Sequence, residues 1–239
     1  MERLKQIVEY LNGGDGFPSP VSDDMWEHYF VEPLFDKYSR EDIAADQGIS
    51  KGVILLKGCE WVLKIPFEGG YCESDFEDAY AGWEEADDPN LPEPHQGDFF
   101  DPFRFATMPD DTEDRWNYCE LECRLYQAAI EMDVACYFAE EYYLGKIKNH
   151  PVYYQKRVTF SQKEYSKERT RSTSERCREL EVPCFDAEWI TDFFDAYGEE
   201  EFVRLSNFLS DYRIYDLHSG NLGYLNGLPI ILDYASYNG

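Results

Sequence analysis

The stretch Asp216-Leu217-His218-Ser219-Gly220-Asn221, with the later apolar run Leu228-Pro229-Ile230-Ile231-Leu232 and Asp233, decides the expected fold of this chain. Asn226-Gly227, directly before the apolar run, is a strong two-residue hairpin turn. We therefore expect a β-hairpin that brings the side chains of Asp216, Asn221 and Asp233 to one place. Carboxylate and amide oxygens suit magnesium, which is a hard cation. The pattern predicts a site for a metal ion and a phosphate group.

This motif resembles the catalytic and metal-binding segments of the protein-kinase-like superfamily. The resemblance is closer to the aminoglycoside and choline kinase branch, because His218 stands where eukaryotic protein kinases usually carry lysine. It implies ATP and Mg²⁺ as cofactors, Asp216 as the catalytic aspartate, and Asn221 and Asp233 as metal ligands. Asp233-Tyr234-Ala235 replaces the usual Asp-Phe-Gly. We expect His218 to be structural and to hydrogen-bond to the backbone of its loop.

Two upstream residues also fit a kinase in order. Lys64, in the β-rich run 60–66, resembles the strand lysine that holds the ATP phosphates. Glu122, on a helix predicted from 117 to about 130, resembles the glutamate that pairs with this lysine. Glu120 is the alternative, but it lies about 200° away around a helix, so only one of the two can face the cleft. We favour Glu122 because apolar residues lie near its face.

The stretch Gly48-Ile49-Ser50-Lys51-Gly52 stands at the place of a glycine-rich phosphate loop. It has two glycines where such loops usually have three, which weakens the expected phosphate cradle. By the resemblance, Gly48, Ser50 and Gly52 contact the nucleotide together with Lys64. The chain after Val158 corresponds to the hinge, where adenine usually binds.

The expected fold class is α+β, a bilobal protein-kinase-like fold with a five-stranded antiparallel small lobe. We expect an N-terminal helical extension over 1–45 and a small lobe over 46–158, which contains an acidic insertion at 68–115. The large lobe, over 159–239, carries the catalytic loop and the metal-binding Asp233. Only six residues follow Asp233 and no activation segment is present, so we expect this lobe to be reduced and mainly helical.

Apolar periodicity and turn residues predict the individual elements. The expected helical segments are residues 3–11, an irregular stretch over 21–45, a charged helix or loop over 161–181, and two helices within 186–211 broken near Gly198. The expected β-rich runs are 51–57 and 60–66, joined as a hairpin, and later 134–146 and 151–158.

The formal net charge is −27, and the segment from Glu68 to Arg115 holds sixteen acidic residues against two arginines. Such a chain is repelled by nucleic acid and by anionic membrane surfaces. It suits a basic protein or a cationic small molecule as its partner. The acidic segment is expected to be an insertion ordered in part by Trp83, Phe99, Phe100, Phe103 and Phe105.

The seven cysteines include no C-x-x-C pair and the four histidines are scattered, so we expect reduced thiols and no zinc site. No apolar run is long enough for a membrane helix, and the start lacks a secretory signal, which points to the cytoplasm.

Three function classes follow from these observations. The first is an ATP- and magnesium-dependent phosphotransferase that acts on a hydroxyl of a protein or a cationic small molecule, with Asp216 orienting the acceptor. The second is a nucleotide-binding module without catalysis. The third is an acidic interaction protein in which the kinase-like residues are incidental.

Overall fold

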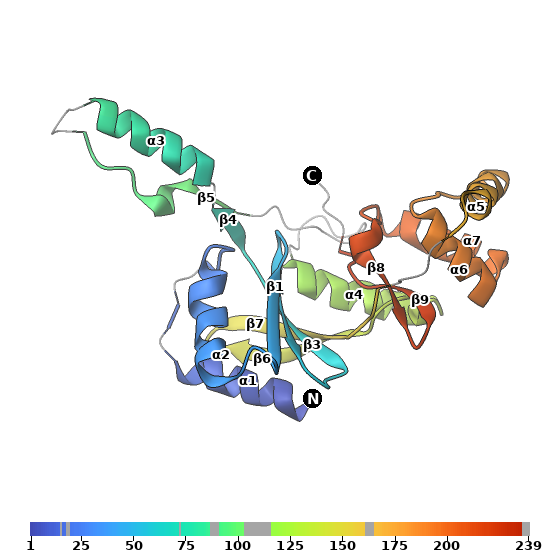
Figure 1. Cartoon of the computed structure of the whole chain (residues 1–239), viewed down its shortest axis with the longest axis horizontal. Helices are drawn as coiled ribbons and strands as arrows, with labels where there is room; N and C mark the ends of the chain where they lie inside the picture. Colours follow the sequence, from blue (N-terminus) through green and yellow to red (C-terminus); the bar gives the residue numbers. More distant parts are fainter. Residues whose placement is uncertain are drawn as a thin grey trace. The chain divides into compact units, whose positions relative to one another are not determined.

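The computed structural model describes residues 1–14, 16–17, 20–71, 73–86, 91–102, 116–160 and 165–235, and Figure 1 colours them along the chain. Helices accompany a five-stranded antiparallel sheet, so the predicted α+β class and the five-stranded sheet are confirmed. The kinase-like bilobal arrangement stays a prediction. Within the described ranges, no helix is long and apolar enough to cross a membrane.

The elements have the following bounds. The α-helices are α1 (Glu2–Gly13), α2 (Glu32–Lys37), α3 (Glu73–Ala86), α4 (Tyr118–Glu131), α5 (Lys167–Glu179), α6 (Ala187–Tyr197) and α7 (Glu199–Asp211). The strands are β1 (Ile43–Gln47), β2 (Lys51–Leu56), β3 (Trp61–Pro66), β4 (Gly69–Tyr71), β5 (Phe100–Pro102), β6 (Glu141–Ile147), β7 (His150–Lys156), β8 (Leu222–Leu225) and β9 (Leu228–Ile231).

The five-stranded sheet has the order β1-β2-β3-β7-β6, and β1 runs antiparallel to β2 with Ile43 opposite Leu56. The adjacent strands β2 and β3 confirm the predicted hairpin. The helical prediction over 21–45 was wrong at its end, because β1 begins at Ile43. Its residues have weak strand propensity, and pairing with β2 outweighs that propensity.

The predicted strand over 134–146 was also wrong in its first half. Residues Ala135–Tyr137 form a 3₁₀ turn, and the strand starts only at Glu141. The turn follows α4 directly, since the Val134 N–H donates to the Ala129 carbonyl at 2.9 Å. The side chains of Val134, Tyr137 and Phe138 are buried. The apolar composition that suggested a strand therefore reflects the burial of this turn.

By packing, the described residues fall into two compact units. The first covers residues 1–58, 63–104 and 144–152, and the second covers 59–62, 105–143 and 153–239. These units interleave along the chain, whereas the three expected segments follow one another. The assignment of lobes to those segments stays a prediction.

The first unit has an aromatic core next to the N-terminal helix. The Trp26 ring stacks on Phe30 with centroids 5.7 Å apart, and Phe67 meets Trp26 edge-on at 6.0 Å. Helix α1 buries Leu4, Ile7, Val8 and Leu11, which confirms the helix predicted over 3–11. A short π-helical turn, Glu27–Val31, leads into α2 and supplies the buried Phe30.

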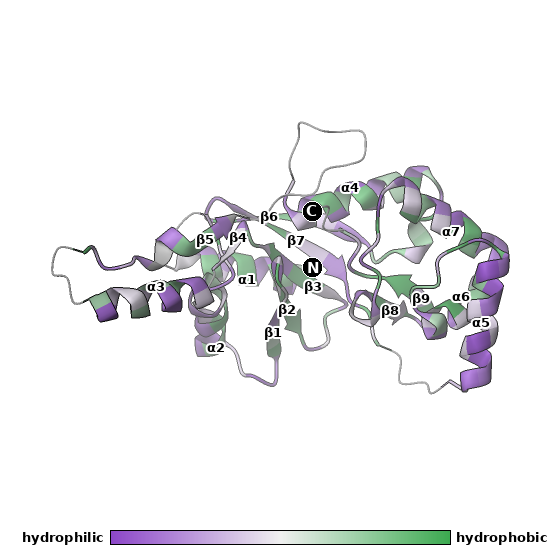
Figure 2. Ribbon diagram, turned by 90° about the horizontal axis from the view of Figure 1, so that it is seen from above, coloured by the Kyte–Doolittle hydropathy of each residue, from purple (hydrophilic) through white to green (hydrophobic). Residues whose placement is uncertain are grey.

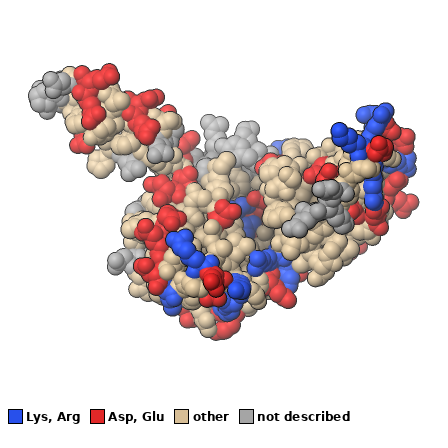
Figure 3. Space-filling model, in the orientation of Figure 1, with Lys and Arg blue, Asp and Glu red and all other residues tan. Residues whose placement is uncertain are grey.

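The acidic segment is ordered in part by aromatic contacts, as predicted. Strands β4 and β5 pair antiparallel, and on α3 the Phe76 ring lies 5.7 Å from Phe99 and 5.8 Å from Tyr80. The Trp83 indole N–H donates to the Leu91 carbonyl at 2.9 Å. Figure 3 shows α3 with acidic side chains along its visible face. Phe103 and Phe105 lie outside the described residues.

The second unit confirms the two helices predicted within 186–211. Helices α6 and α7 meet at Gly198. Its φ is 90°, a conformation that glycine adopts without strain. Their buried faces carry Phe193 and Phe202, whose rings are 5.4 Å apart. Helix α5 lies against α6 through a 2.6 Å hydrogen bond between the Thr173 and Thr191 hydroxyls. In Figure 2, α5 is mostly hydrophilic, in agreement with its charged sequence.

Candidate functional site

The predicted hairpin carries the central motif. Strands β8 and β9 pair antiparallel with Leu222 opposite Ile231. The turn residues Asn226 and Gly227 have φ values of 54° and 81°, the positive pair that a type I′ turn requires. The Asn-Gly signal and the hairpin are therefore confirmed.

The open end of this hairpin brings together the three residues of the predicted metal site. The Asn221 side-chain amide donates to the Asp216 carbonyl oxygen at 2.7 Å. The backbone N–H of Leu232, the residue before Asp233, donates to the Asn221 carbonyl at 3.0 Å. Since Asn221 uses its amide nitrogen as a donor, its amide oxygen is the atom suited to a cation.

The three residues differ in exposure in a way that suits different roles. Asn221 is 8% exposed and Asp233 is half-buried, whereas Asp216 is exposed. His218 accepts a hydrogen bond at Nδ1 from the Gly220 N–H at 3.1 Å, and its Nε2 lies 3.7 Å from a carboxylate oxygen of Asp216. The expectation that His218 bonds to the backbone of its own loop is confirmed.

The interior carboxylate predicted on α4 lies in the same unit as the loop. Glu122 is fully buried and accepts from the backbone N–H of Tyr234 at 3.4 Å, one residue beyond Asp233. Glu120 instead is 32% exposed, pairs with Arg124 at 3.3 Å and accepts from the Tyr153 hydroxyl at 2.9 Å. Of the two glutamates, Glu122 is the one that faces inward.

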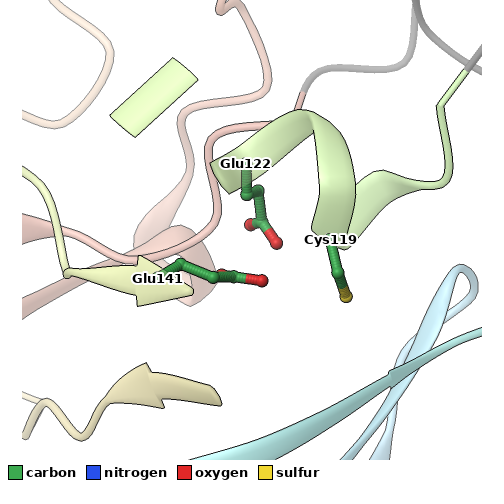
Figure 4. A group of neighbouring side chains, drawn as sticks. All are labelled: Cys119, Glu122 and Glu141. Carbon is green, nitrogen blue, oxygen red and sulfur yellow. The ribbon is translucent and has the colours of Figure 1, made fainter. Parts of the chain in front are cut away.

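A second buried carboxylate, Glu141 on β6, faces Glu122, as Figure 4 shows. Together with Cys119 they form a group whose ligand atoms lie within 4.8 Å of one another, the one such group of histidine, cysteine or acidic residues in the described part of the chain. Glu141 also accepts from the Gln155 amide at 2.8 Å. No spacing motif marks Glu141, because only the fold brings β6 to α4.

Glu122 and Glu141 thus form a pair of buried carboxylates in the second unit. Burial, followed by the charges of Glu141 and Glu122, raises the pKa of the neighbouring Tyr234 phenol above its ordinary range. The kinase resemblance assigns a lysine to Glu122.

That lysine, Lys64 on β3, belongs to the first unit and is 2% exposed. Its predicted pairing with Glu122 is an interaction between the two units and stays a prediction. The expected phosphate loop forms the turn from β1 to β2, closed by a hydrogen bond from the Gly48 N–H to the Lys51 carbonyl at 2.9 Å. The Ser50 carbonyl accepts from the Phe67 N–H at 2.8 Å.

Gly52 has a packing reason in addition to the predicted one. A Cβ atom at this position would collide with the Trp26 ring, so the core of the first unit requires glycine here. The predicted contacts of Gly48, Ser50 and Gly52 with a nucleotide stay predictions.

The segment after β7, the predicted hinge, lies alongside the β8–β9 hairpin. Thr159 and Tyr224 exchange two backbone hydrogen bonds, at 2.9 and 2.7 Å. A cavity of about 320 Å³ opens beside this pairing and is lined in part by Phe160, Ser219 and the acidic residues Asp186 and Glu188. Its lining thus combines several aromatic rings, hydroxyl groups and two carboxyl groups.

No protein-family model, curated protein or solved structure matches this chain.

Proposed function

We propose that this protein is an ATP- and magnesium-dependent phosphotransferase that acts on a hydroxyl group. The observation that carries the proposal is the open end of the β8–β9 hairpin. There the Asn221 side chain donates a hydrogen bond to the Asp216 backbone carbonyl, and the Asn221 carbonyl accepts one from the Leu232 N–H. Asn221 and Asp233, at this end of the hairpin, offer an amide oxygen and a carboxylate oxygen, and magnesium prefers such ligands. Transfer of a phosphoryl group depends mainly on positioning and on charge stabilisation.

Each residue has a distinct role in this proposal. Asn221 and Asp233 hold Mg²⁺, which supplies charge neutralisation for the phosphates of ATP. Lys64 binds the phosphates and Glu122 orients the lysine, while the turn from Gly48 to Gly52 covers the nucleotide. Asp216, exposed at the loop, orients the acceptor hydroxyl and accepts its proton.

The acceptor is a protein or a small molecule that carries positive charge. The net charge of −27 attracts such an acceptor over long range. The cavity beside the loop supports the same class, because its carboxylates Asp186 and Glu188 and its aromatic Phe160 suit an organic cation.

Nucleotide binding is tested by thermal melting with and without ATP and Mg²⁺. Saturating ligand should raise the melting temperature of the wild type, by the mass-action stabilisation of the bound state. Asp233→Ala should abolish the increase, whereas Asp211→Ala, an exposed aspartate at the end of α7, should retain it. An unchanged increase in Asp233→Ala would place the metal elsewhere.

A nucleotide-binding module without catalysis is the second candidate. The degenerate phosphate loop, with two glycines where three are usual, favours it, because nucleotide binding can persist in such a loop without phosphoryl transfer. Binding of ATP with no phosphoryl transfer would separate this candidate from the enzyme.

A further inference from the structure

Two cysteines at the end of α5 are placed side by side by a chain reversal. Cys177 lies in the last turn of α5 and is 1% exposed, whereas Cys184 follows the helix and is exposed. Both are free thiols. A sequence separation of seven residues would hold them far apart in a continuous helix, so the reversal between them decides their contact.

The reversal is well defined by backbone hydrogen bonds. Leu180 donates its N–H to the Arg176 carbonyl at 3.0 Å, and Glu181 adopts a left-handed conformation with φ of 58°. The Val182 N–H then donates back to the Cys177 carbonyl at 3.0 Å. The chain therefore turns at Glu181 and returns Cys184 toward the last turns of α5.

The side chains meet as a result. The Cys184 sulfur donates to the Ser174 hydroxyl at 3.5 Å, and Ser174 lies one helical turn before Cys177. After burial, this neighbouring Cys184 thiol is the group that raises the pKa of Cys177 most. Burial raises the pKa of Cys177 to about 12, so this sulfur is a neutral thiol near pH 7 and the exposed Cys184 is the one that meets reagents.

We propose that Cys177 and Cys184 are a thiol pair that a hydroperoxide converts to an intramolecular disulfide. The Cys184 thiolate attacks a peroxide oxygen, which gives a sulfenic acid and releases one molecule of water or alcohol. The Cys177 sulfur then attacks the sulfenic sulfur, the S–S bond forms, and water leaves with the proton of Cys177. Two thiols are oxidised and one peroxide is reduced, so the electrons balance.

The bond would tie the end of α5 to the segment before α6. Cys184 stands two residues before Asp186, whose carboxylate accepts from the Glu188 and Trp189 N–H groups and caps α6. The bridge thus restrains the connection between two helices of the second unit. This inference is independent of phosphoryl transfer.

The test uses the full-length protein, reduced and desalted, then treated with hydrogen peroxide at a few equivalents and alkylated. Trypsin cuts after Arg176, Arg178 and Arg204, so Cys177 leaves in the dipeptide 177–178 and Cys184 in the peptide 179–204. We expect these two peptides to be joined, a loss of 2 Da in the intact mass, and reversal by dithiothreitol.

Matched variants locate the bond. Cys136→Ser, which removes another exposed thiol, should leave the joined peptides unchanged, whereas Cys184→Ser should abolish them. The proposal is overturned if the wild-type peptides stay separate, whether Cys184 remains reduced or proceeds to a sulfinic acid, or if Cys184 is joined to a different cysteine.

Discussion

Asn221 offers the sharpest perturbation of the candidate site, because its side chain serves two purposes that substitutions can separate. Its amide nitrogen donates to the Asp216 carbonyl at 2.7 Å, and its amide oxygen is the proposed metal ligand. Asn221→Ala removes both groups at a position that is 8% exposed. Asn221→Asp removes the donor but keeps an oxygen for the cation.

The magnitude follows from the lost hydrogen bond. A net contribution of about 1 kcal/mol, with a similar cost for the carbonyl left without its donor, gives a destabilisation of about 1–2 kcal/mol. For a chain of this size that lowers the melting temperature by roughly 2–8 °C. Without nucleotide, the melting temperature of Asn221→Ala should fall by this amount, and that of Asn221→Asp by at least as much, because its carboxylate then faces the Asp216 carbonyl.

Melting with ATP and Mg²⁺ then separates the two purposes. Asn221→Asp should regain stability on ligand addition, whereas Asn221→Ala should not. Asn207→Ala, an exposed asparagine on α7, should behave as the wild type in both conditions. An Asn221→Ala protein that keeps the full increase would refute the ligand role, and undiminished stability without nucleotide would refute the hydrogen bond.

Two further predictions concern buried polar groups. Asp192 is buried and accepts hydrogen bonds from the hydroxyls of Tyr165 and, at 2.8 Å, Tyr224. In urea denaturation, Asp192→Ala should therefore lower the unfolding free energy by about 3 kcal/mol, and Tyr224→Phe by about half of that. Equal and small effects of the two substitutions would contradict this hydrogen-bond network. Burial lowers the pKa of His150, whose Nε2 lies 2.6 Å from the Pro66 carbonyl oxygen. As the pH falls, the His150 imidazole therefore becomes protonated in the unfolded chain at a higher pH than in the folded chain. The unfolding free energy should fall as the pH drops below about 6.5, the ordinary pKa of histidine. His150→Gln should show a smaller loss between pH 7.5 and 5.5, and identical slopes would argue against this assignment.

The elements that the sequence predicts well are those whose signals are local. The Asn226-Gly227 turn fixes the hairpin through two positive φ values, and Gly198 divides α6 from α7 in the same way. The apolar spacing on α1 and α4 reports directly which face is buried. Within the loop from Asp216 to Asn221, the predicted bond of His218 to the loop backbone is also local.

The features that escaped prediction depend on contacts between distant segments. Strand β1 has little intrinsic preference for a strand and exists through pairing with β2. Glu141 meets Glu122 only because β6 lies beside α4, so its position in the sequence carries no signal. Gly52 fits a phosphate-loop pattern, yet the structure also gives it a steric reason in Trp26.

The most direct test of the account measures transfer of labelled phosphate from ATP in the presence of Mg²⁺, for the wild type and Asp216→Ala side by side. Acceptors are host lysate, the protein itself and water. We predict transfer by the wild type and a rate about 10²–10⁴-fold lower for Asp216→Ala, with ATP affinity within a few-fold, because an orienting base acts in the transition state. A wild type that binds ATP and Mg²⁺ but transfers phosphate to none of these acceptors would contradict the enzyme and favour the nucleotide-binding module.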